Sequence, residues 1–282
     1  MPRLLDIDGG ASYFDMSKPI DISIPLNFNG AQPNAYGVKP ATSEPCAAGD
    51  LIGDTRLGGS CNFEQYTFIP HCNGTHTECV GHITRERITI LECLKDVFIP
   101  ARLITIAPTY AADTDETYAS QINASDRLIT RKALESARAA SSRADQILGR
   151  TFRDSKAGLI IRTLPNDERK LKRRYVEDVP PYFTNEAMQF IAESRFAHLV
   201  VDLPSIDRLY DEGRLSNHRI FWDMKQGSFE TSYKTRLNST ITEMIYVPNA
   251  VEDGQYLLNL QIAPFATDAS PSRPLIFPIA KN

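Results

Sequence analysis

Apolar and polar residues alternate in several short segments of this chain. Residues 21–26, Asp-Ile-Ser-Ile-Pro-Leu, place an apolar side chain at every second position. Because successive side chains of a strand point to opposite faces, this alternation predicts a half-buried strand. Further apolar segments predict strands at residues 64–69, 101–107, 158–163, 198–203, 240–247, 255–264 and 274–279.

Two other segments repeat their apolar residues at steps of three and four, which is the helical period. The first opens at Thr130, a residue type that caps helices, and continues to a stop at Gly149. The second opens at Thr184 and ends before the strand predicted at 198–203. Several strands with two or three helices between them predict an α+β or α/β domain in which strands have the larger share.

Two polar stretches interrupt this pattern. Residues 27–60 are rich in Gly, Pro and Asn and have no clear period. Loops of that length are usually lids, binding loops or oligomer contacts, and we expect one of these roles. Residues 169–174, Arg-Lys-Leu-Lys-Arg-Arg, are interpreted as a solvated loop.

Composition places the chain among globular proteins, with 42% apolar and 23% charged residues in a length of 282. The sequence shows no internal repeat and no Gly/Ser-rich or Pro-rich linker. We therefore expect one domain spanning residues 1–282.

Charge and cysteine usage narrow the choice of partners and compartment. The 31 Lys and Arg residues are outnumbered by 35 Asp and Glu residues, so the net charge is −4, whereas nucleic-acid binding needs a basic excess. No apolar run approaches the roughly 18 residues of a membrane span, and residues 1–17 lack the apolar core of a signal peptide. The five Cys residues contain no C-x-x-C pair. We expect a reduced, cytoplasmic protein with neither nucleic-acid nor membrane partners.

Candidate chemistry is concentrated in residues 71–82, His-Cys-Asn-Gly-Thr-His-Thr-Glu-Cys-Val-Gly-His, which hold three of the five His residues of the chain. His76 and Glu78 are two positions apart, so on an extended strand both side chains leave the same face and can converge on one ion. His82 is far enough along to follow a turn and return to the same place. The sequence thus predicts a metal site.

Other metal motifs fail on particular residues. His76-Thr77-Glu78 matches the H-x-E of zinc deaminases, but no P-C-x-x-C follows it. The separation of His76 and His82 excludes H-E-x-x-H, and the H-x-H of a two-histidine cupin set is absent.

The segment resembles the H-x-G-T-H-x-D-x-P-x-H motif of the metal-dependent cyclase-like hydrolases, the family of bacterial kynurenine formamidase and isatin hydrolase. Gly74, Thr75, His76 and His82 match at the family's spacing. Other segments resemble family motifs in the same order over nearly the whole chain. They are residues 21–23 (Asp-Ile-Ser), 202–207 (Asp-Leu-Pro-Ser-Ile-Asp), 216–218 (Ser-Asn-His), 242–244 (Thr-Glu-Met) and 268–273 (Asp-Ala-Ser-Pro-Ser-Arg).

The chain departs from this motif at three places. Glu78 stands where the family usually has Asp, and Val80 replaces its Pro. The first His should lie four residues before His76, but Cys72 occupies that position and His71 lies five before it. Strand parity favours Cys72, and a thiolate is a good zinc ligand, whereas a one-residue bulge would bring in His71. We favour His71, because a thiolate would suit only soft metals.

The resemblance implies the rest of the site. His218 corresponds to the later metal-ligand His and Glu243 to the carboxylate after it, with Glu230 as the alternative because residues 226–238 read as a polar insertion. His82 corresponds to the catalytic His, while His198 matches nothing and is interpreted as structural. The implied metal ligands are His71, His76, Glu78, His218 and Glu243. Asp202, Ser205 and Asp207 either orient ligands or shape a turn.

The resemblance also implies a fold and a reaction. The fold is α/β of the swivelling β/β/α type, a β-rich domain with few helices around a central mixed sheet or barrel-like core. The implied activity is arylformamidase-like hydrolysis of a C–N bond in a formamide, amide or cyclic amide, with one or two zinc or manganese ions. Alternatives are a ring-opening lactone or cyclic-imide hydrolase, or a non-catalytic metal- or ligand-binding protein. The implied partners are a small-molecule substrate and further copies of the chain, as a homodimer or larger homo-oligomer.

Overall fold

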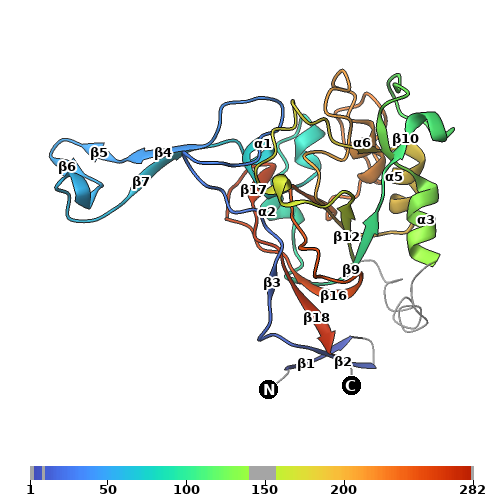
Figure 1. Cartoon of the computed structure of the whole chain (residues 1–282), viewed down its shortest axis with the longest axis horizontal. Coiled ribbons are helices and arrows are strands. Elements are labelled where there is room, and N and C mark those ends of the chain that lie inside the picture. Colours follow the sequence, from blue (N-terminus) through green and yellow to red (C-terminus); the bar gives the residue numbers. More distant parts are fainter. Residues whose placement is uncertain (1–2, 8–9, 140–156, 281–282) are drawn as a thin grey trace.

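A mixed sheet of eleven strands joins segments from both ends of the chain in the computed structural model, which describes residues 3–7, 10–139 and 157–280 (Figure 1). Its strands follow the order β1-β2-β18-β16-β9-β12-β14-β15-β8-β17, and β3 also pairs with β18. The strands of this sheet are β1 (Arg3–Ile7), β2 (Gly10–Phe14), β3 (Ile20–Asp21), β8 (His76–Glu78), β9 (Phe98–Ile106), β12 (Gly158–Thr163), β14 (His198–Val201), β15 (Thr240–Glu243), β16 (Gly254–Asn259), β17 (Ala269–Pro271) and β18 (Leu275–Ala280).

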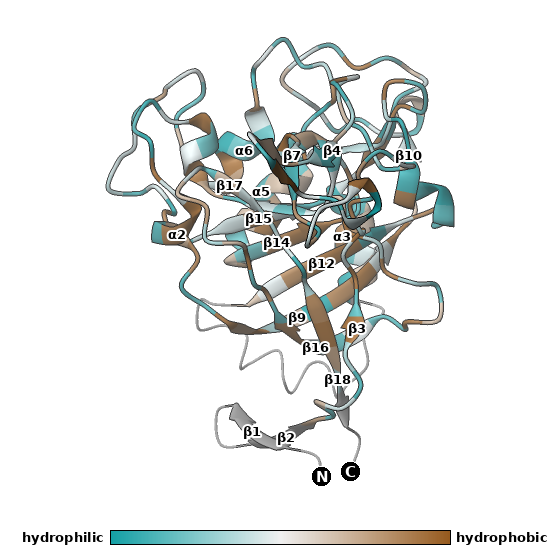
Figure 2. Cartoon of the chain, turned by 90° about the vertical axis from the view of Figure 1, so that its left-hand side faces the viewer, coloured by the Kyte–Doolittle hydropathy of each residue, from teal (hydrophilic) through white to brown (hydrophobic). Residues whose placement is uncertain are grey.

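Parallel strands form the centre of this sheet, where β9, β12, β14 and β15 lie side by side (Figure 2). All six residues of β12 are buried, as expected of a parallel strand covered on both faces. One face packs against the helices α3 (Arg131–Ala139), α5 (Asn185–Glu193) and α6 (Ser216–Phe221) through a cluster that includes Leu134, Met188 and Phe221. The other face packs against Ile22 and Val247. The result is a curled, β-rich α/β fold with few helices, as the sequence predicted.

The remaining elements are short. A three-stranded sheet contains β10 (Thr109–Tyr110), β11 (Arg127–Ile129) and β13 (Tyr182–Phe183). The other helices are α1 (Pro70–Asn73) and α2 (Ile90–Cys93), and the 3-10 turns are η1 (Thr55–Leu57), η2 (Val80–Ile83), η3 (Ala111–Asp113) and η5 (Glu168–Lys172). In the described part of the chain, no helix combines the length and apolar character needed to cross a bilayer.

Most of the predicted helices and strands are present, but they begin or end at other residues than predicted. Thr184 caps α5 by accepting a hydrogen bond from the Ala187 amide at 3.0 Å, and Thr130 does the same for α3 from Ala133 at 3.2 Å. Residues 140–149 of the first predicted helix lie outside the described residues. The strand predicted at 21–26 is wrong in extent, because only β3 and an isolated bridge between Ser23 and Ile245 form there.

The segment 27–60 forms more regular structure than a loop. Together with β7 (Glu64–Thr67) it builds an arm, residues 42–67, that contains β4 (Thr42–Pro45), β5 (Ala47–Ala48), β6 (Leu51–Ile52) and η1, and projects from the body of the molecule (Figure 1). Its apolar side chains stay outside, since Leu57 is 63% exposed and Leu51 is 49% exposed.

The charged run 169–174 is not the solvated loop that we expected. Lys170 is only 2% exposed, and its Nζ lies 2.7 Å from Asp202 Oδ2 beneath the end of β12. Arg173 is also largely buried and pairs with Asp178 at 3.0 Å. Lys170 and Arg173 thus turn inward and meet carboxylates, whereas Arg169, Lys172 and Arg174 are exposed. A count of charges along the sequence cannot show this difference.

Candidate metal centre

β8 carries the central pair of the candidate metal centre. It pairs antiparallel with β15 on one side and β17 on the other, which places Glu243 directly opposite His76. Directly opposite residues of an antiparallel pair share a face, so His76, Glu78 and Glu243 all project from one side of the sheet. All three side chains are at least 96% buried.

Two connections bring further imidazoles to this face. The chain enters β8 through α1, which begins at Pro70 and places His71 beside the strand. It leaves β8 through η2, which turns His82 back toward Glu78, as the spacing predicted. The rings of His71 and His82 stack at 4.2 Å between centroids.

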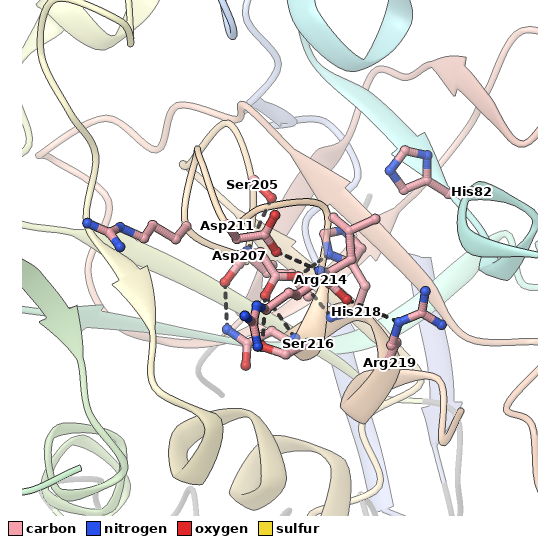
Figure 3. A network of polar contacts seen from close by, with 12 residues as sticks. His82, Ser205, Asp207, Asp211, Arg214, Ser216, His218 and Arg219 are labelled. Carbon is pink, nitrogen blue, oxygen red and sulfur yellow. Dashed lines mark hydrogen bonds and ion pairs between the residues drawn. The ribbon is translucent and has the colours of Figure 1, made fainter. Parts of the chain in front are cut away.

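His218 arrives from α6, on the opposite side of Glu78. Asp207 Oδ2 accepts a hydrogen bond from its Nδ1 at 2.6 Å (Figure 3). This contact directs Nε2 toward Glu78 Oε1, at 3.0 Å. Asp207 also accepts hydrogen bonds from the Asn217 amide and the Tyr118 hydroxyl, so its carboxylate is itself fixed. A carboxylate behind a ligand histidine is a common arrangement in metal sites.

Glu78 lies at the middle of these groups. Its Oε2 is 3.0 Å from His71 Nδ1 and 4.0 Å from His82 Nε2. Glu243 is slightly further out, with Oε2 at 3.6 Å from His76 Nε2 and Oε1 at 3.9 Å from His218 Nε2. Candidate ligand atoms within 4.8 Å of one another form the groups His71/His76/Glu78, Glu78/His82/His218 and His71/His82/Asp268.

Two buried atoms test whether a cation fits here. Among the described residues, neither His76 Nε2 nor Glu78 Oε2 has a hydrogen-bond partner, although His71 Nδ1 comes within 3.0 Å of the latter. Buried polar atoms without a partner cost free energy, and a metal ion would satisfy both. Imidazole nitrogens and carboxylate oxygens are suitable donors, so the residues fit a divalent ion.

The carboxylates and imidazoles of the cluster are buried close together, and this shifts their pKa values. Burial raises the pKa of Glu78, but the charges of His82 and His218 outweigh it and hold that pKa well below its usual range. Burial, together with the charge of Glu78, raises the pKa of Glu243. Burial and the neighbouring His71 lower the pKa of His76 to about 3. His76 is therefore neutral, the form that binds a metal.

The other candidate residues of the sequence analysis either lie away from the cluster or make other contacts. Among the described residues, Cys72 belongs to none of the three groups, and burial and Glu243 raise the pKa of its thiol to about 11. Glu230 is exposed and lies 3.3 Å from Arg85. Asp202 binds Lys170, and Ser205 Oγ accepts a hydrogen bond from the Asp207 amide. His198 is buried with Nδ1 2.9 Å from Thr240 Oγ1, away from the cluster.

Sequence reasoning missed the contacts of Asp268 at this site, and it noted Tyr36 only as part of the segment 27–60 that could close the site or reach a neighbouring subunit. Asp268, noted only as part of a motif, lies 2.9 Å from His71 Nε2 and 3.3 Å from His82 Nδ1. Tyr36 contacts Ser205, and burial and the nearby Glu243 raise its pKa. Its ring meets that of Tyr210 edge to face at 6.3 Å, and the two are 38% and 62% exposed. Tyr36 has φ +58° and lies in the long irregular segment, so no period marks it.

Comparisons with known proteins agree on one family. A family model described as "Putative cyclase" matches residues 14–208. The chain is 25% identical to a kynurenine formamidase of Bacillus cereus over 270 residues, which is 93% of this chain and 99% of that protein. A kynurenine formamidase of Bacillus thuringiensis is 24% identical over the same shares of the two chains.

Solved structures show the same fold. Isatin hydrolase A from Labrenzia aggregata superposes with a TM-score of 0.59 at 15% identity, over 92% of this chain and 93% of that one. A protein of Bacillus stearothermophilus described as a "predicted metal-dependent hydrolase" superposes with a TM-score of 0.56 at 15% identity, over 92% of this chain and 98% of that one.

Proposed function

The chain belongs to the cyclase family, and from this premise we propose that it is a metal-dependent hydrolase of a C–N bond in a formamide, amide or cyclic amide. The kynurenine formamidases that it resembles along almost their whole length support hydrolysis of an amide bond outside peptides. The isatin hydrolase fold supports the same class of reaction. The observation that carries the proposal is the convergence, in one buried cluster, of His76 Nε2 and Glu78 Oε2, neither of which has a hydrogen-bond partner in the described part of the chain.

The proposed metal ligands are the three imidazoles and two carboxylates that face one another beside β8. When bound, one or two zinc or manganese ions would lower the pKa of a water molecule and polarise a substrate carbonyl. Glu78 has one oxygen toward His71 and the other toward His218, and so it is placed to serve two ions. The full set is His71, His76, Glu78, His218 and Glu243.

His82 is the proposed catalytic proton carrier. Its side chain is 28% exposed, and its Nε2 faces Glu78 Oε2 from 4.0 Å, so the ring touches both the buried cluster and the solvent. An imidazole at that boundary can take a proton from attacking water and give it to the leaving nitrogen.

The Tyr36 and Tyr210 rings favour an aromatic substrate. They form an exposed edge-to-face pair, and the Tyr36 hydroxyl reaches Ser205 near Glu243. An aryl group stacked there would gain apolar contact area while its amide pointed to the cluster. This feature supports the arylformamidase-like assignment.

His82→Ala is the test of the mechanism. In the zinc- or manganese-reconstituted protein, it should lower kcat on aryl formamides by about 100-fold or more, the range typical of lost acid–base catalysis. Bound metal per chain should stay the same, and Glu230→Gln, which changes an exposed carboxylate outside the cluster, should keep full activity. Unchanged turnover in His82→Ala would refute the role.

The same assay decides between the competing functions. Faster turnover of lactones or cyclic imides than of formamides would identify a ring-opening hydrolase. Bound metal without hydrolysis of any formamide, lactam or ester would identify a binding protein. A homodimeric or larger assembly and a cytoplasmic location stay predictions from the sequence.

A further inference from the structure

Asp268 is held in place by backbone pairing on both sides. It immediately precedes β17, whose Ala269 pairs with Glu78, and its carbonyl accepts a hydrogen bond from the Cys79 amide at 3.0 Å. The preceding carbonyl, that of Thr267, accepts a hydrogen bond from the Ile90 amide at 2.8 Å. The carboxylate of Asp268 therefore projects from a fixed stretch of chain beside β8.

Close packing keeps the η2 turn against this residue. A Cβ at Gly81 would lie 1.9 Å from the Ile88 carbonyl oxygen and 3.4 Å from Asp268 Cβ. The turn comes this near only because position 81 has no side chain. His82, the next residue, is thereby brought to the carboxylate.

A single carboxylate oxygen meets two histidines. Asp268 Oδ2 lies 2.9 Å from His71 Nε2 and 3.3 Å from His82 Nδ1. An ionised carboxylate only accepts hydrogen bonds, so each of these ring nitrogens must carry its proton. The remaining nitrogens, His71 Nδ1 and His82 Nε2, face Glu78 Oε2 at 3.0 and 4.0 Å.

We propose that Asp268 is a positioning residue that fixes opposite tautomers in these two histidines. It holds His71 as the Nε2–H form, which leaves Nδ1 free to bind metal, and His82 as the Nδ1–H form, which leaves Nε2 free to take a proton. A carboxylate behind a ligand or base sets both tautomer and ring orientation. The inference rests on the proposed function for the roles of His71 and His82, but the tautomers themselves can be measured without turnover.

Imidazole ¹⁵N spectra of the zinc-loaded protein test this directly, because the chain has only five His residues. We expect Nε2–H at His71 and Nδ1–H at His82, with resonances assigned by His71→Gln and His82→Gln. In Asp268→Ala both ring nitrogens lose the oxygen that accepts their protons. At least one of the two rings should then change tautomer, while the spectrum of Asp113→Ala, which removes an exposed carboxylate on η3, should match the wild type.

Zinc affinity of the metal-free protein, measured by chelator competition, gives the second readout. Asp268→Ala should bind zinc about 10–100-fold more weakly than wild type, the usual cost of losing the partner behind a ligand. At saturating zinc its kcat should fall at least tenfold with KM within about threefold, because the base is misoriented while the substrate surface is intact.

The outcomes separate this inference from the proposed function. The opposite tautomer at either histidine in the wild type, or unchanged tautomers and affinity in Asp268→Ala, would overturn it even if the protein hydrolyses formamides. Changed tautomers and affinity would uphold it even if no substrate is turned over, and then only the proposed function fails. If the variant does not fold, the wild-type spectrum still tests the inference, because the opposite tautomer at either ring overturns it.

Discussion

At the residue scale, the sharpest choice is between His71 and Cys72 as the first proposed metal ligand. His71→Ala should weaken zinc binding by more than the roughly 10–100-fold that an outer partner costs, because it removes a nitrogen that faces Glu78 at 3.0 Å. Cys72→Ser should change the affinity by less than about threefold, because burial keeps the thiol protonated. Chelator competition on the metal-free proteins measures both, and the reverse order of effects would make Cys72 the ligand.

A buried ion pair gives a second prediction about single residues. Lys170→Met removes the partner of Asp202 and leaves that carboxylate buried and uncompensated, so it should lower the free energy of unfolding by about 3–5 kcal/mol. Lys172→Met, two positions along and exposed, should stay within about 0.5 kcal/mol of wild type. Urea denaturation compares them, and equal stabilities would show that the buried pair contributes nothing.

The sequence predicted the candidate centre well where the residues are close in sequence. His76, Glu78 and His82 share one strand and the turn after it, so their spacing is enough to place them together. Asp268 was missed because its contacts with His71 and His82 depend on the pairing of β17 with β8, almost two hundred residues away in the chain. The spacing of residues within one motif does not show which distant strand pairs with it, or in which register.

At the element scale, the arm of residues 42–67 has exposed apolar side chains and therefore little apolar packing of its own to stabilise it. A two-stranded ribbon is marginally stable alone, and this one exposes Leu51, Ile52 and Leu57. In the homo-oligomer that the sequence predicts, a second copy of the chain would cover these apolar side chains.

Replacing residues 46–62 with a short Gly-Ser linker should therefore convert the assembly to a monomer. Sedimentation velocity should show this shift, and circular dichroism should show an unchanged sheet, because β8 and its neighbours are not touched. Leu91→Ser on α2 is the matched control, since it also removes an exposed leucine but lies outside the arm. An assembly that survives the loss of the arm would place the interface elsewhere.

Two helices show when capping residues and apolar periodicity predict a helix and when they do not. α5 was predicted because Thr184 caps it and its apolar face is regular. α6, which carries His218, was missed because it has six residues and follows Leu215, an N-cap residue with φ +48° and no capping side-chain hydrogen bond. A helix this short is set by its packing against the sheet, and propensity alone does not reveal it.

At the scale of the whole molecule, the fold brings together groups that cannot all keep their ordinary charges without metal. Glu78, Glu243 and Asp268 surround the proposed ligand histidines, so in metal-free protein it is protons that offset the negative charge of these carboxylates. Burial lowers the pKa of His71, but its contacts with Asp268 and Glu78 outweigh this and raise that pKa to about 10. The stability of the metal-free protein is thereby tied to pH.

The direction of this dependence follows from the shift of His71. A folded-state pKa of about 10 against an ordinary 6.5 means that the folded form holds a proton that the unfolded form releases in this range. The contribution is complete below pH 6.5 and lost as pH rises toward 10, on the order of 5 kcal/mol in total. The raised pKa of Glu243 acts in the same direction.

The metal-free protein should therefore lose thermal stability steadily between pH 6.5 and 9, whereas the zinc-loaded protein should not. Bound zinc would replace the protons as the positive charge among the three carboxylates, so that ion and proton compete for the same places. Calorimetry on chelator-treated and zinc-loaded samples at pH 6.5, 8 and 9 measures the effect. In His71→Gln the metal-free protein should lose part of this slope, because glutamine cannot hold the proton, while the raised pKa values of His218 and Glu243 keep the rest. Parallel pH profiles for the two forms of the wild type would mean that zinc does not replace the protons held by this cluster.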